Sequence, residues 1–243
     1  MTNRIGTRAQ WIAARADLLA REKELTRMGD ELALQRRELP WVPVEKHYTL
    51  ETESGARTLA ELFDGRSQLM IYHFMFGSQW EAGCPTCSST ADSFNGILPH
   101  LEACDVTMIC VSDAPLEKLL AYRERMGWGF PYVSTYETDF AFDFGLALTP
   151  QQAQEIPEVK GMLDSPPEWL EDWGRQIGAP LEDGLREGPA WIAFARENGS
   201  VYHTYTVSAP DPFVAPYHSF LLERAPKANL EDFRAWRKDE YPD

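Results

Sequence analysis

The sequence predicts an α/β protein with a mixed central sheet flanked by helices. Two apolar runs, residues 69–76 and 106–111, are long enough for buried strands, and a helix-forming stretch lies between them. Two parallel strands joined by a helix form a right-handed βαβ unit. Strand-like segments at 190–195 and 201–206 are joined by an Asn-Gly turn, which predicts an antiparallel hairpin. Parallel and antiparallel pairs together make the predicted sheet mixed.

The composition fits one globular domain with appendages, because 243 residues of which 44% are hydrophobic can form a sizeable core. The formal net charge of −15 argues against nucleic acid or an anionic membrane as a partner, since phosphate binding needs clustered Lys and Arg. The charged N-terminal segment lacks the apolar core of a signal peptide, and no window approaches the ~18 apolar residues of a spanning helix. We therefore expect a cytoplasmic protein without membrane contact.

Residues 8–37 are expected to form one long polar helix within an N-terminal extension, residues 1–43, that ends at Pro40 and Pro43. Arg21 and Gln35 interrupt a heptad seam on this helix. Packing against the chain's own body is therefore favoured over a homodimer formed through the helix. Apolar residues recur every seven positions: Trp11, Leu18, Leu25, Leu32 and Leu39.

The main domain is expected to span residues 44–225, with a C-terminal helix in 226–243 that packs on the sheet through Phe233 and Trp236. The remaining elements follow in order: a strand at 46–50, a turn at 53–55, a short helix at 58–63, a helix from the first Cys pair to about Ala103, a helix from Leu116 to about Met126, and a strand at 132–135.

The segment at about 146–187 is Pro-rich and acidic, which indicates an insertion in the main domain. Its prolines exclude any long element, so we expect short helices around Trp169 and Trp173. A lid over the functional site is the role considered for it.

The motif Cys84-Pro85-Thr86-Cys87 follows a buried strand and opens a helix. Backbone N–H groups and the helix macrodipole stabilise a thiolate at this position, so Cys84 is the predicted nucleophile. Cys87, one helical turn later, is the predicted resolving cysteine that closes a disulfide. Pro85 supports the site by setting the helical φ at the first turn. The expected substrate is a disulfide or another electrophilic sulfur compound, protein or small molecule, with no cofactor and no metal.

The order of strand, CxxC, helix, strand, helix, strand, hairpin and helix resembles the thioredoxin-like fold, in the layout shared by peroxiredoxins and membrane-tethered thiol-disulfide reductases. Residues 48–74, 128–145 and 188–207 carry the likeness. The resemblance implies a cis proline that faces the dithiol, and Pro189 after Gly188 is the matching position. Phe130-Pro131 is the second choice.

A closer resemblance is to a bacterial family of thioredoxin-like proteins of unknown function, domain-of-unknown-function family 899. It implies the fold and a redox site but no substrate. The matching residues are Tyr72-His73-Phe74-Met75-Phe76-Gly77, Trp80, Gly83-Cys84-Pro85-x-Cys87-Ser88, Ala91-Asp92, Pro99-His100-Leu101, Met126-Gly127-Trp128, Asp143-Phe144-Gly145 and His203-Thr204-Tyr205.

Further candidate site residues are Trp80, Gly83 and His203, together with Gly188-Pro189 on the substrate side. Trp80 could shield the thiolate and contact a partner, or pack within its loop. Gly83 directly precedes the nucleophile and is a supporting residue. His203 could relay a proton to the thiolate, although a structural histidine is favoured on its alternating strand.

Three other functions compete with the dithiol. Peroxiredoxins place Thr or Ser three residues before the reactive cysteine and Pro four residues further back, whereas this chain has Glu81 and Gly77 there, which disfavours a peroxidase. The spacing of Cys84, Cys87, His100 and Cys104 matches a zinc site, although a long strand on each side disfavours a zinc finger. A thioredoxin-like binding module without catalysis is the third alternative.

Overall fold

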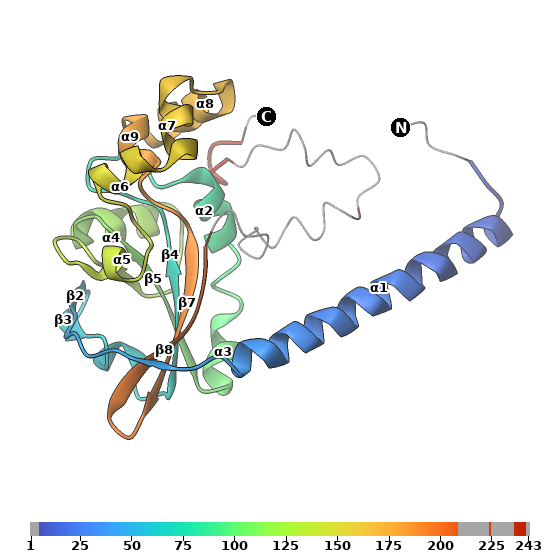
Figure 1. Ribbon diagram of the computed structural model, residues 1–243, viewed down its shortest axis with the longest axis horizontal. Coiled ribbons are helices and arrows are strands. Elements are labelled where there is room, and N and C mark those ends of the chain that lie inside the picture. Colours follow the sequence, from blue (N-terminus) through green and yellow to red (C-terminus); the bar gives the residue numbers. More distant parts are fainter. Residues whose placement is uncertain (1–4, 209–223, 225–235, 242–243) are drawn as a thin grey trace. The chain divides into compact units, whose positions relative to one another are not determined.

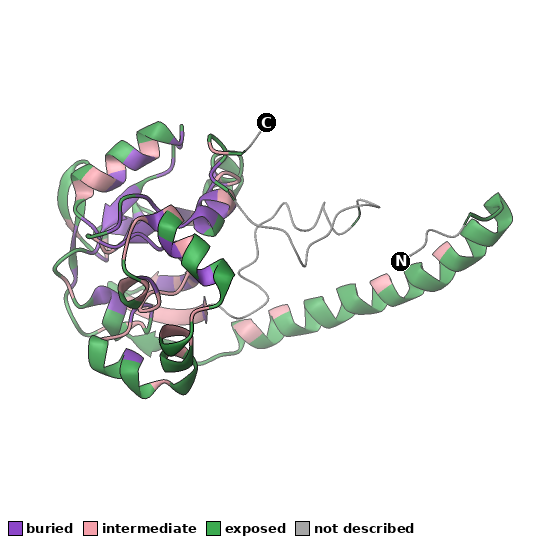
Figure 2. Cartoon of the chain, turned by 90° about the horizontal axis from the view of Figure 1, so that it is seen from above, coloured by how far each residue is buried: buried purple, intermediate pink, exposed green. Residues whose placement is uncertain are grey.

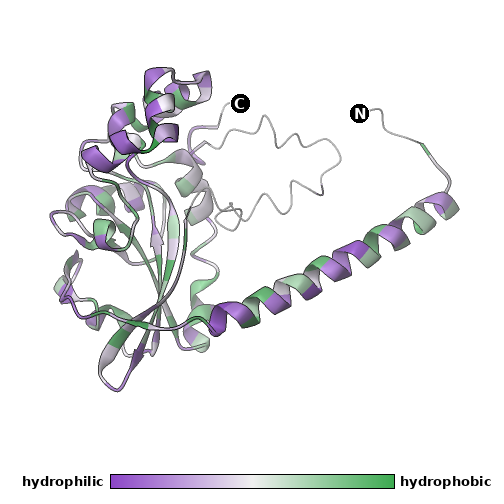
Figure 3. Ribbon diagram, in the orientation of Figure 1, coloured by the Kyte–Doolittle hydropathy of each residue, from purple (hydrophilic) through white to green (hydrophobic). Residues whose placement is uncertain are grey.

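The computed structural model describes residues 5–208, 224 and 236–241, and it divides after Trp41 into two units. The first unit is helix α1, Arg8–Arg37, which begins at a capping box between Thr7 and Gln10. The predicted helix at 8–37 is confirmed. None of its residues is buried (Figure 2), and hydrophobic and hydrophilic residues alternate along it (Figure 3). The surface that its heptad residues contact stays a prediction.

The second unit is built on a mixed sheet, which has eight strands in the described residues, in the order β1-β8-β7-β4-β5-β6-β2-β3 (Figure 1). Strand β4 is parallel to β5 and antiparallel to β7, so the predicted parallel pair and the mixed sheet are confirmed. The strands are β1 Val42–Pro43, β2 Thr49–Thr52, β3 Gly55–Thr58, β4 Gln68–His73, β5 Val106–Ser112, β6 Tyr132–Ser134, β7 Ala190–Glu197 and β8 Ser200–Ser208.

The predicted hairpin is confirmed, with Asn198 and Gly199 at φ of 51° and 82° between β7 and β8. Positive φ at both turn positions is what a two-residue type I′ turn requires. This hairpin beside a parallel βαβ unit gives the thioredoxin-like layout, of the peroxiredoxin type, that the resemblance implies.

The strands β4 and β5 lie at the centre and are covered on both faces. Alternate residues of β4 belong to two different core clusters, with Ile71 in one and Tyr72 in the other. The cluster around Tyr72 also holds Cys84 and Cys87, so the dithiol packs on that face of the sheet.

The helices of the second unit follow the strands. In Figure 1, helices α6–α9 lie at the end of the sheet where α2 begins. The helical structure expected around Trp169 and Trp173 is confirmed as one helix, α8, and the same segment also forms α6, α7 and α9, which were not predicted. The helices are η1 Glu61–Phe63 (a 3₁₀ turn), α2 Pro85–Ala91, α3 Leu98–Ala103, α4 Leu116–Arg125, α5 Phe140–Asp143, α6 Pro150–Glu155, α7 Pro157–Asp164, α8 Glu168–Ile177 and α9 Leu181–Gly184.

The prediction of one helix from the Cys pair to Ala103 is wrong. Helix α2 ends at Ala91 and α3 begins at Leu98. Between them, Asn95 bonds to the backbone of Gly127 and Gly129, and these tertiary bonds hold the segment in turns.

Two other helices are not found in the described residues as the sequence predicts them. The short helix predicted at 58–63 is in part a strand, because residues 55–58 pair with β2 and only Glu61–Phe63 is helical. The C-terminal helix predicted in 226–243 lies largely outside the described residues, and the described residues 236–241 contain a turn. Among the helices that the structure describes, none combines the length and the apolar character needed to cross a membrane.

Candidate active site

The dithiol lies just beyond the carboxyl end of β4. Cys84 is the N-cap of α2 and Pro85 is its first residue, so the chain turns into the helix at the first cysteine. The Cys84 backbone N–H donates to the Met75 carbonyl at 3.0 Å, which ties the start of α2 to the end of the strand segment. Cys84 and Cys87 are both free thiols, and Cys84 is only 3% exposed. The structure therefore places both predicted cysteines beyond the carboxyl end of the central strand β4.

The two thiols differ in acidity. Hydrogen bonds from the Cys87 thiol, the Cys87 and Thr86 backbone N–H groups and the Trp173 indole lower the pKa of Cys84 to about 6, against the opposing effect of burial. Burial and the neighbouring Cys84 sulfur raise the pKa of Cys87. The pKa shifts therefore make Cys84 the more acidic of the two thiols.

The inserted segment supplies one of these donors. Trp173 lies in α8, and its Nε1–H donates to Cys84 Sγ at 3.4 Å. The Trp80 ring meets the Trp173 ring edge-on, with centroids 5.5 Å apart. Trp80 is itself buried, so it packs against the indole that contacts the thiolate and does not line the space in front of the sulfur.

A cavity of about 840 Å³ opens in front of Cys84. One wall is the start of α2, with Cys84, Pro85 and Cys87. The opposite wall comes from the insertion and from the described C-terminal residues, with Trp169, Leu170, Trp173, Leu185 and Trp236. A cavity of this size suits a small molecule, since ligand sites are typically about 300–1,000 Å³.

Pro189 lines the same cavity, so the structure brings this predicted residue to the dithiol. The Gly188 carbonyl before it accepts a hydrogen bond from His73 Nδ1 at 2.8 Å. A carbonyl can only accept, and therefore Nδ1 carries the proton. Burial lowers the pKa of His73 to about 4, which keeps the ring neutral. The neutral His73 ring thus holds the segment that carries Pro189.

Glu187 is a cavity residue that the sequence did not single out. Burial, helped by nearby Asp113, raises its pKa to about 8, so the carboxyl is protonated at neutral pH. The Phe76 backbone N–H bonds to this carboxyl, and Oε2 is buried with no partner in the described part of the chain. The one sequence signal that points to Glu187 is its position directly before Gly188-Pro189.

Gly83 is required by close packing. A Cβ at this position would lie 2.5 Å from Phe74 Cε1 and 3.0 Å from Tyr122 Cε1. The Gly83 carbonyl accepts from the guanidinium of Arg237, at 2.6 Å from Nη2, and Arg237 also bonds to Tyr122 and to the Gln176 carbonyl. Arg237 therefore ties the residue before the nucleophile to α4 and α8.

The other two candidates lie away from the dithiol. His203 pairs with Phe194 on the neighbouring strand, four residues or about 13 Å along β7 from the cavity end of the sheet. Its Nε2 bonds to Thr206 Oγ1 and its ring packs on Phe144. Pro131 precedes β6, which is parallel to β5, and it borders a different cavity at the opposite end of the sheet.

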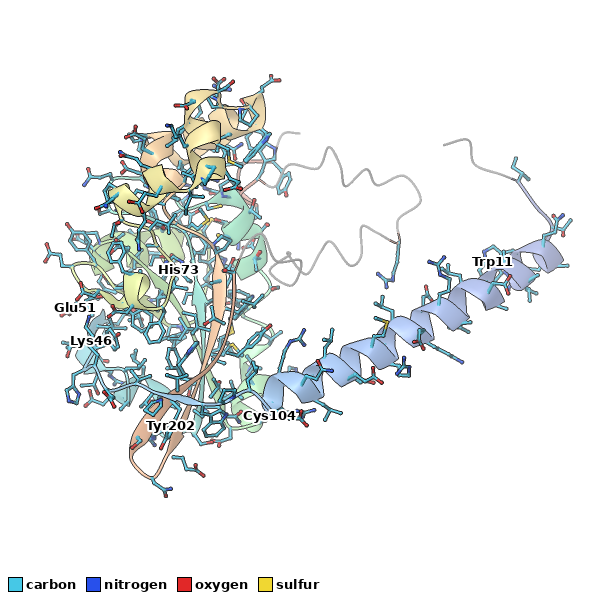
Figure 4. All side chains as sticks on the ribbon, viewed as in Figure 1. Trp11, Lys46, Glu51, His73, Cys104 and Tyr202 are labelled. Carbon is cyan, nitrogen blue, oxygen red and sulfur yellow. The ribbon has the colours of Figure 1, made fainter. Side chains whose placement is uncertain are left out.

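The four residues of the zinc pattern are not brought together. The Cys104 carbonyl accepts from Gln68, the first residue of β4, whereas Cys84 bonds to Met75 beyond the last. Seven extended residues span about 20 Å, while zinc ligands must converge within about 2.3 Å of one ion. Cys104 lies at the end of the sheet away from the insertion helices (Figure 4). Among the described residues no group of three or more metal-ligating side chains is found.

The model of the family described as "Bacterial protein of unknown function (DUF899)" matches residues 1–241. The chain belongs to this family. The resemblance to this family, which the sequence motifs indicate, is thereby confirmed. Among curated proteins, none matches it.

Solved structures similar to this DUF899 chain are distant in sequence. Peroxidoxin BcpB from Mycobacterium tuberculosis is 13% identical, with a TM-score of 0.47 over 71% of this chain and 86% of that one. A mutant of PrxQ from Xylella fastidiosa is 13% identical, with a TM-score of 0.46 over 73% and 86%. A hypothetical protein from Sinorhizobium meliloti 1021 is 16% identical, with a TM-score of 0.38 over 68% and 70%.

Proposed function

We propose that this chain is a thiol–disulfide oxidoreductase in which Cys84 is the nucleophile and Cys87 the resolving cysteine. The observation that carries the proposal is the environment of Cys84, whose sulfur receives hydrogen bonds that lower its pKa while it borders a cavity. A purely structural buried cysteine has its pKa raised, as Cys110 does. Cys84 departs from that pattern in the direction that a nucleophile needs.

The reaction needs only the two thiols. The Cys84 thiolate attacks one sulfur of a disulfide, forms a mixed disulfide and releases the other sulfur as a thiolate. Cys87 loses its proton to the medium and attacks Cys84, which releases the second thiolate and leaves a Cys84–Cys87 disulfide. Two electrons pass to the substrate, and a thiol reductant returns the protein to its dithiol form. Trp173, by donating to the Cys84 sulfur, stabilises the thiolate before attack.

Two substitutions test the roles separately. Cys84→Ser should abolish reduction of small disulfides, because the attacking sulfur is gone. Cys87→Ser should still attack but not resolve, so it should accumulate a mixed disulfide visible by mass spectrometry. Thiol titration of the wild type, before and after a mild disulfide oxidant, should show two thiols that cycle together. A zinc assay on the same sample is the control.

The proposal fails if both thiols stay unreactive in the folded protein or if stoichiometric zinc binds them. It also fails if the two serine substitutions impair folding equally and show no separate effect on disulfide reduction. Peroxide reduction is not favoured as the main activity, because Glu81 and Gly77 occupy the positions where peroxiredoxins carry their peroxide-binding Thr or Ser and their Pro.

A further inference from the structure

We infer that the substrate is a small, uncharged and largely apolar disulfide that carries an amide or a similar hydrogen-bonding group, and not a folded protein or an anionic disulfide. This inference rests on the proposed function, since it names the substrate class of the same dithiol.

Access to the nucleophile is restricted. Cys84 is 3% exposed, and the inserted helices stand opposite it across the cavity. A reductase that acts on folded proteins must bring a disulfide on one surface against a sulfur on another. Here α8, through Trp173 and Leu170, and the residues after α9, through Leu185, occupy the space that such a partner would need. A molecule that fits within about 840 Å³ can reach the sulfur without moving them.

The wall of the cavity favours apolar groups. Three indoles, those of Trp169, Trp173 and Trp236, border it together with Leu170, Leu185 and Met75. Aromatic side chains of this kind provide large flat apolar surfaces on which a ring or an alkyl chain can be buried. Burial of such surface favours binding, before the costs of association.

The charges in the cavity disfavour an anion. Among the lining residues that the structure describes, Arg175 is the one cation, and it is paired with Asp172 on the same helix. Glu187 adds no positive charge in either of its protonation states. An anionic disulfide would therefore leave carboxylates in an apolar space without a free cation, within a chain whose formal net charge is −15.

Two buried polar atoms in the cavity wall have no hydrogen-bond partner among the described residues. They are Gln176 Oε1 and Glu187 Oε2, and both residues line the cavity. The Gln176 oxygen accepts a hydrogen bond, and the protonated Glu187 carboxyl donates one. Buried polar groups are normally satisfied, so these two indicate a ligand that both donates and accepts. An amide next to the disulfide meets both requirements.

A matched series of disulfides tests the inference with the full-length chain. The probes are 3,3′-dithiodipropionic acid, its diamide and its N,N′-dibenzyl diamide, which share the same S–S surroundings, with insulin as the protein disulfide. Pre-reduced, desalted protein is mixed with each probe, and the released thiol is quantified after acid quenching in a single turnover. Rates are divided by those of an unstructured peptide with the sequence of residues 83–88, which removes differences in intrinsic reactivity.

We expect the normalised rate to rise at least about tenfold from the diacid to the diamide, equivalent to about 1.4 kcal/mol, and to rise again for the dibenzyl diamide. Insulin should remain oxidised over the same period. Trp169→Ala should reduce the advantage of the dibenzyl diamide over the diamide, whereas Ile97→Ala, which removes a half-exposed apolar side chain outside the cavity, should preserve it.

Equal normalised rates for the diacid and the diamide, or reduction of insulin as fast as of the diamide, would overturn the inference and leave the proposed function standing. Failure of every probe to oxidise the dithiol, together with Cys84 and Cys87 thiols that stay unreactive towards 5,5′-dithiobis(2-nitrobenzoic acid) in a Cys104→Ser background, would remove the proposed function as well. The two failures are thus separated by one set of measurements.

Discussion

At the scale of single residues, the acidity of Cys84 depends on local hydrogen bonds more than on a long helix. Helix α2 has seven residues, so its dipole is short, and burial by itself would raise the pKa of a thiol. The Cys87 thiol and two backbone N–H groups come from α2 and its first turn. The fourth donor, the Trp173 indole, comes from 89 residues further along the chain.

The first prediction is that Trp173→Phe raises the pKa of Cys84. The substitution keeps an aromatic ring but removes the N–H that bonds to the thiolate. A hydrogen bond to a charged group contributes about 1.5 kcal/mol or more, so the pKa should rise by about one unit from its value near 6. The pH dependence of iodoacetamide alkylation measures it, in a Cys104→Ser background that removes the exposed thiol.

Trp169→Phe is the matched control, since Trp169 lies one turn earlier in α8 and borders the same cavity. Its alkylation midpoint should stay at the wild-type value. A Trp173→Phe midpoint equal to that of Trp169→Phe would show that the indole N–H does not stabilise the thiolate.

Site residues differ in how far the sequence predicts them. The sequence predicts Cys84 and Cys87 from a local motif and Pro189 from a family resemblance. Trp173 and Glu187 owe their place to tertiary packing, because their functional atoms meet Cys84 or the cavity only after the insertion folds. The structural role favoured for His203 agrees with its contacts to Thr206 and Phe144, whereas its distance from the dithiol could not be predicted, since strand alternation gives only the face of a residue.

At the scale of elements, α2 is fixed to the sheet by close contact at Gly83. The second prediction is that Gly83→Ala lowers the free energy of unfolding by roughly 1–3 kcal/mol, the usual cost of overpacking. The new Cβ would lie 2.5 Å from Phe74 and 3.0 Å from Tyr122, both buried rings that cannot easily move. Urea denaturation followed by tryptophan fluorescence measures the change.

Gly96→Ala is its control. Nothing lies within 4 Å of a Cβ at Gly96, so that variant should change stability by less than about 0.5 kcal/mol. Similar losses for the two variants would argue that Gly83 is not held by the packing described.

The elements themselves were predictable where their cause is local. The hairpin at 190–208 follows from Asn198-Gly199, which tolerates positive φ, and α1 follows from an unbroken stretch of helix formers. The interruption between α2 and α3 has a tertiary cause, because Asn95 bonds to residues 32 and 34 positions away. No local pattern around Asn95 reveals those partners.

At the scale of the whole folded unit, Arg237 connects segments that are far apart in the sequence. Its guanidinium is 2% exposed and bonds to Gly83, Tyr122 and Gln176, which belong to the segment before α2, to α4 and to α8. A single buried cation therefore holds the insertion and the nucleophile segment in one arrangement.

The third prediction is that Arg237→Met lowers the free energy of unfolding by about 3 kcal/mol. Methionine keeps much of the apolar stem, but it leaves two buried carbonyls without their donors, each at a cost of roughly 1–3 kcal/mol. Lys238→Met is the control, because Lys238 is half exposed and its pair with Asp92 should contribute less than about 1 kcal/mol. Comparable urea midpoints for the two variants would contradict the connecting role of Arg237.

The pH dependence of stability combines buried groups with opposite signs. His73 has a folded pKa of about 4, below the value of 6.5 for an exposed His, so its contribution is complete above 6.5 and is lost as the pH falls towards 4. Glu187 has a folded pKa of about 8, above its ordinary 4.5, so its contribution is complete below 4.5 and is lost as the pH rises to 8. Between pH 6.5 and 8 the His73 contribution is complete, and Glu187 lowers stability as the pH rises. Cys84, whose pKa is lowered to about 6 from 9.0, raises stability over the same range, and this contribution is common to the wild type and to a variant changed at Glu187 alone.

The fourth prediction follows for Glu187→Gln, which keeps a neutral hydrogen-bonding group and removes the titration. Its stability relative to the wild type should increase between pH 6.5 and 8 by up to about 1.4 kcal/mol per pH unit, since the wild type alone must release a buried proton there. The neighbouring Asp113 and the Cys84 thiolate both repel a Glu187 carboxylate, while Arg186 attracts it, so the slope reports their balance as well as burial. Urea midpoints at pH 6, 7 and 8 measure the difference. A constant difference across this range would mean that Glu187 is already ionised in the folded protein, and the donor assigned to it in the cavity would be absent.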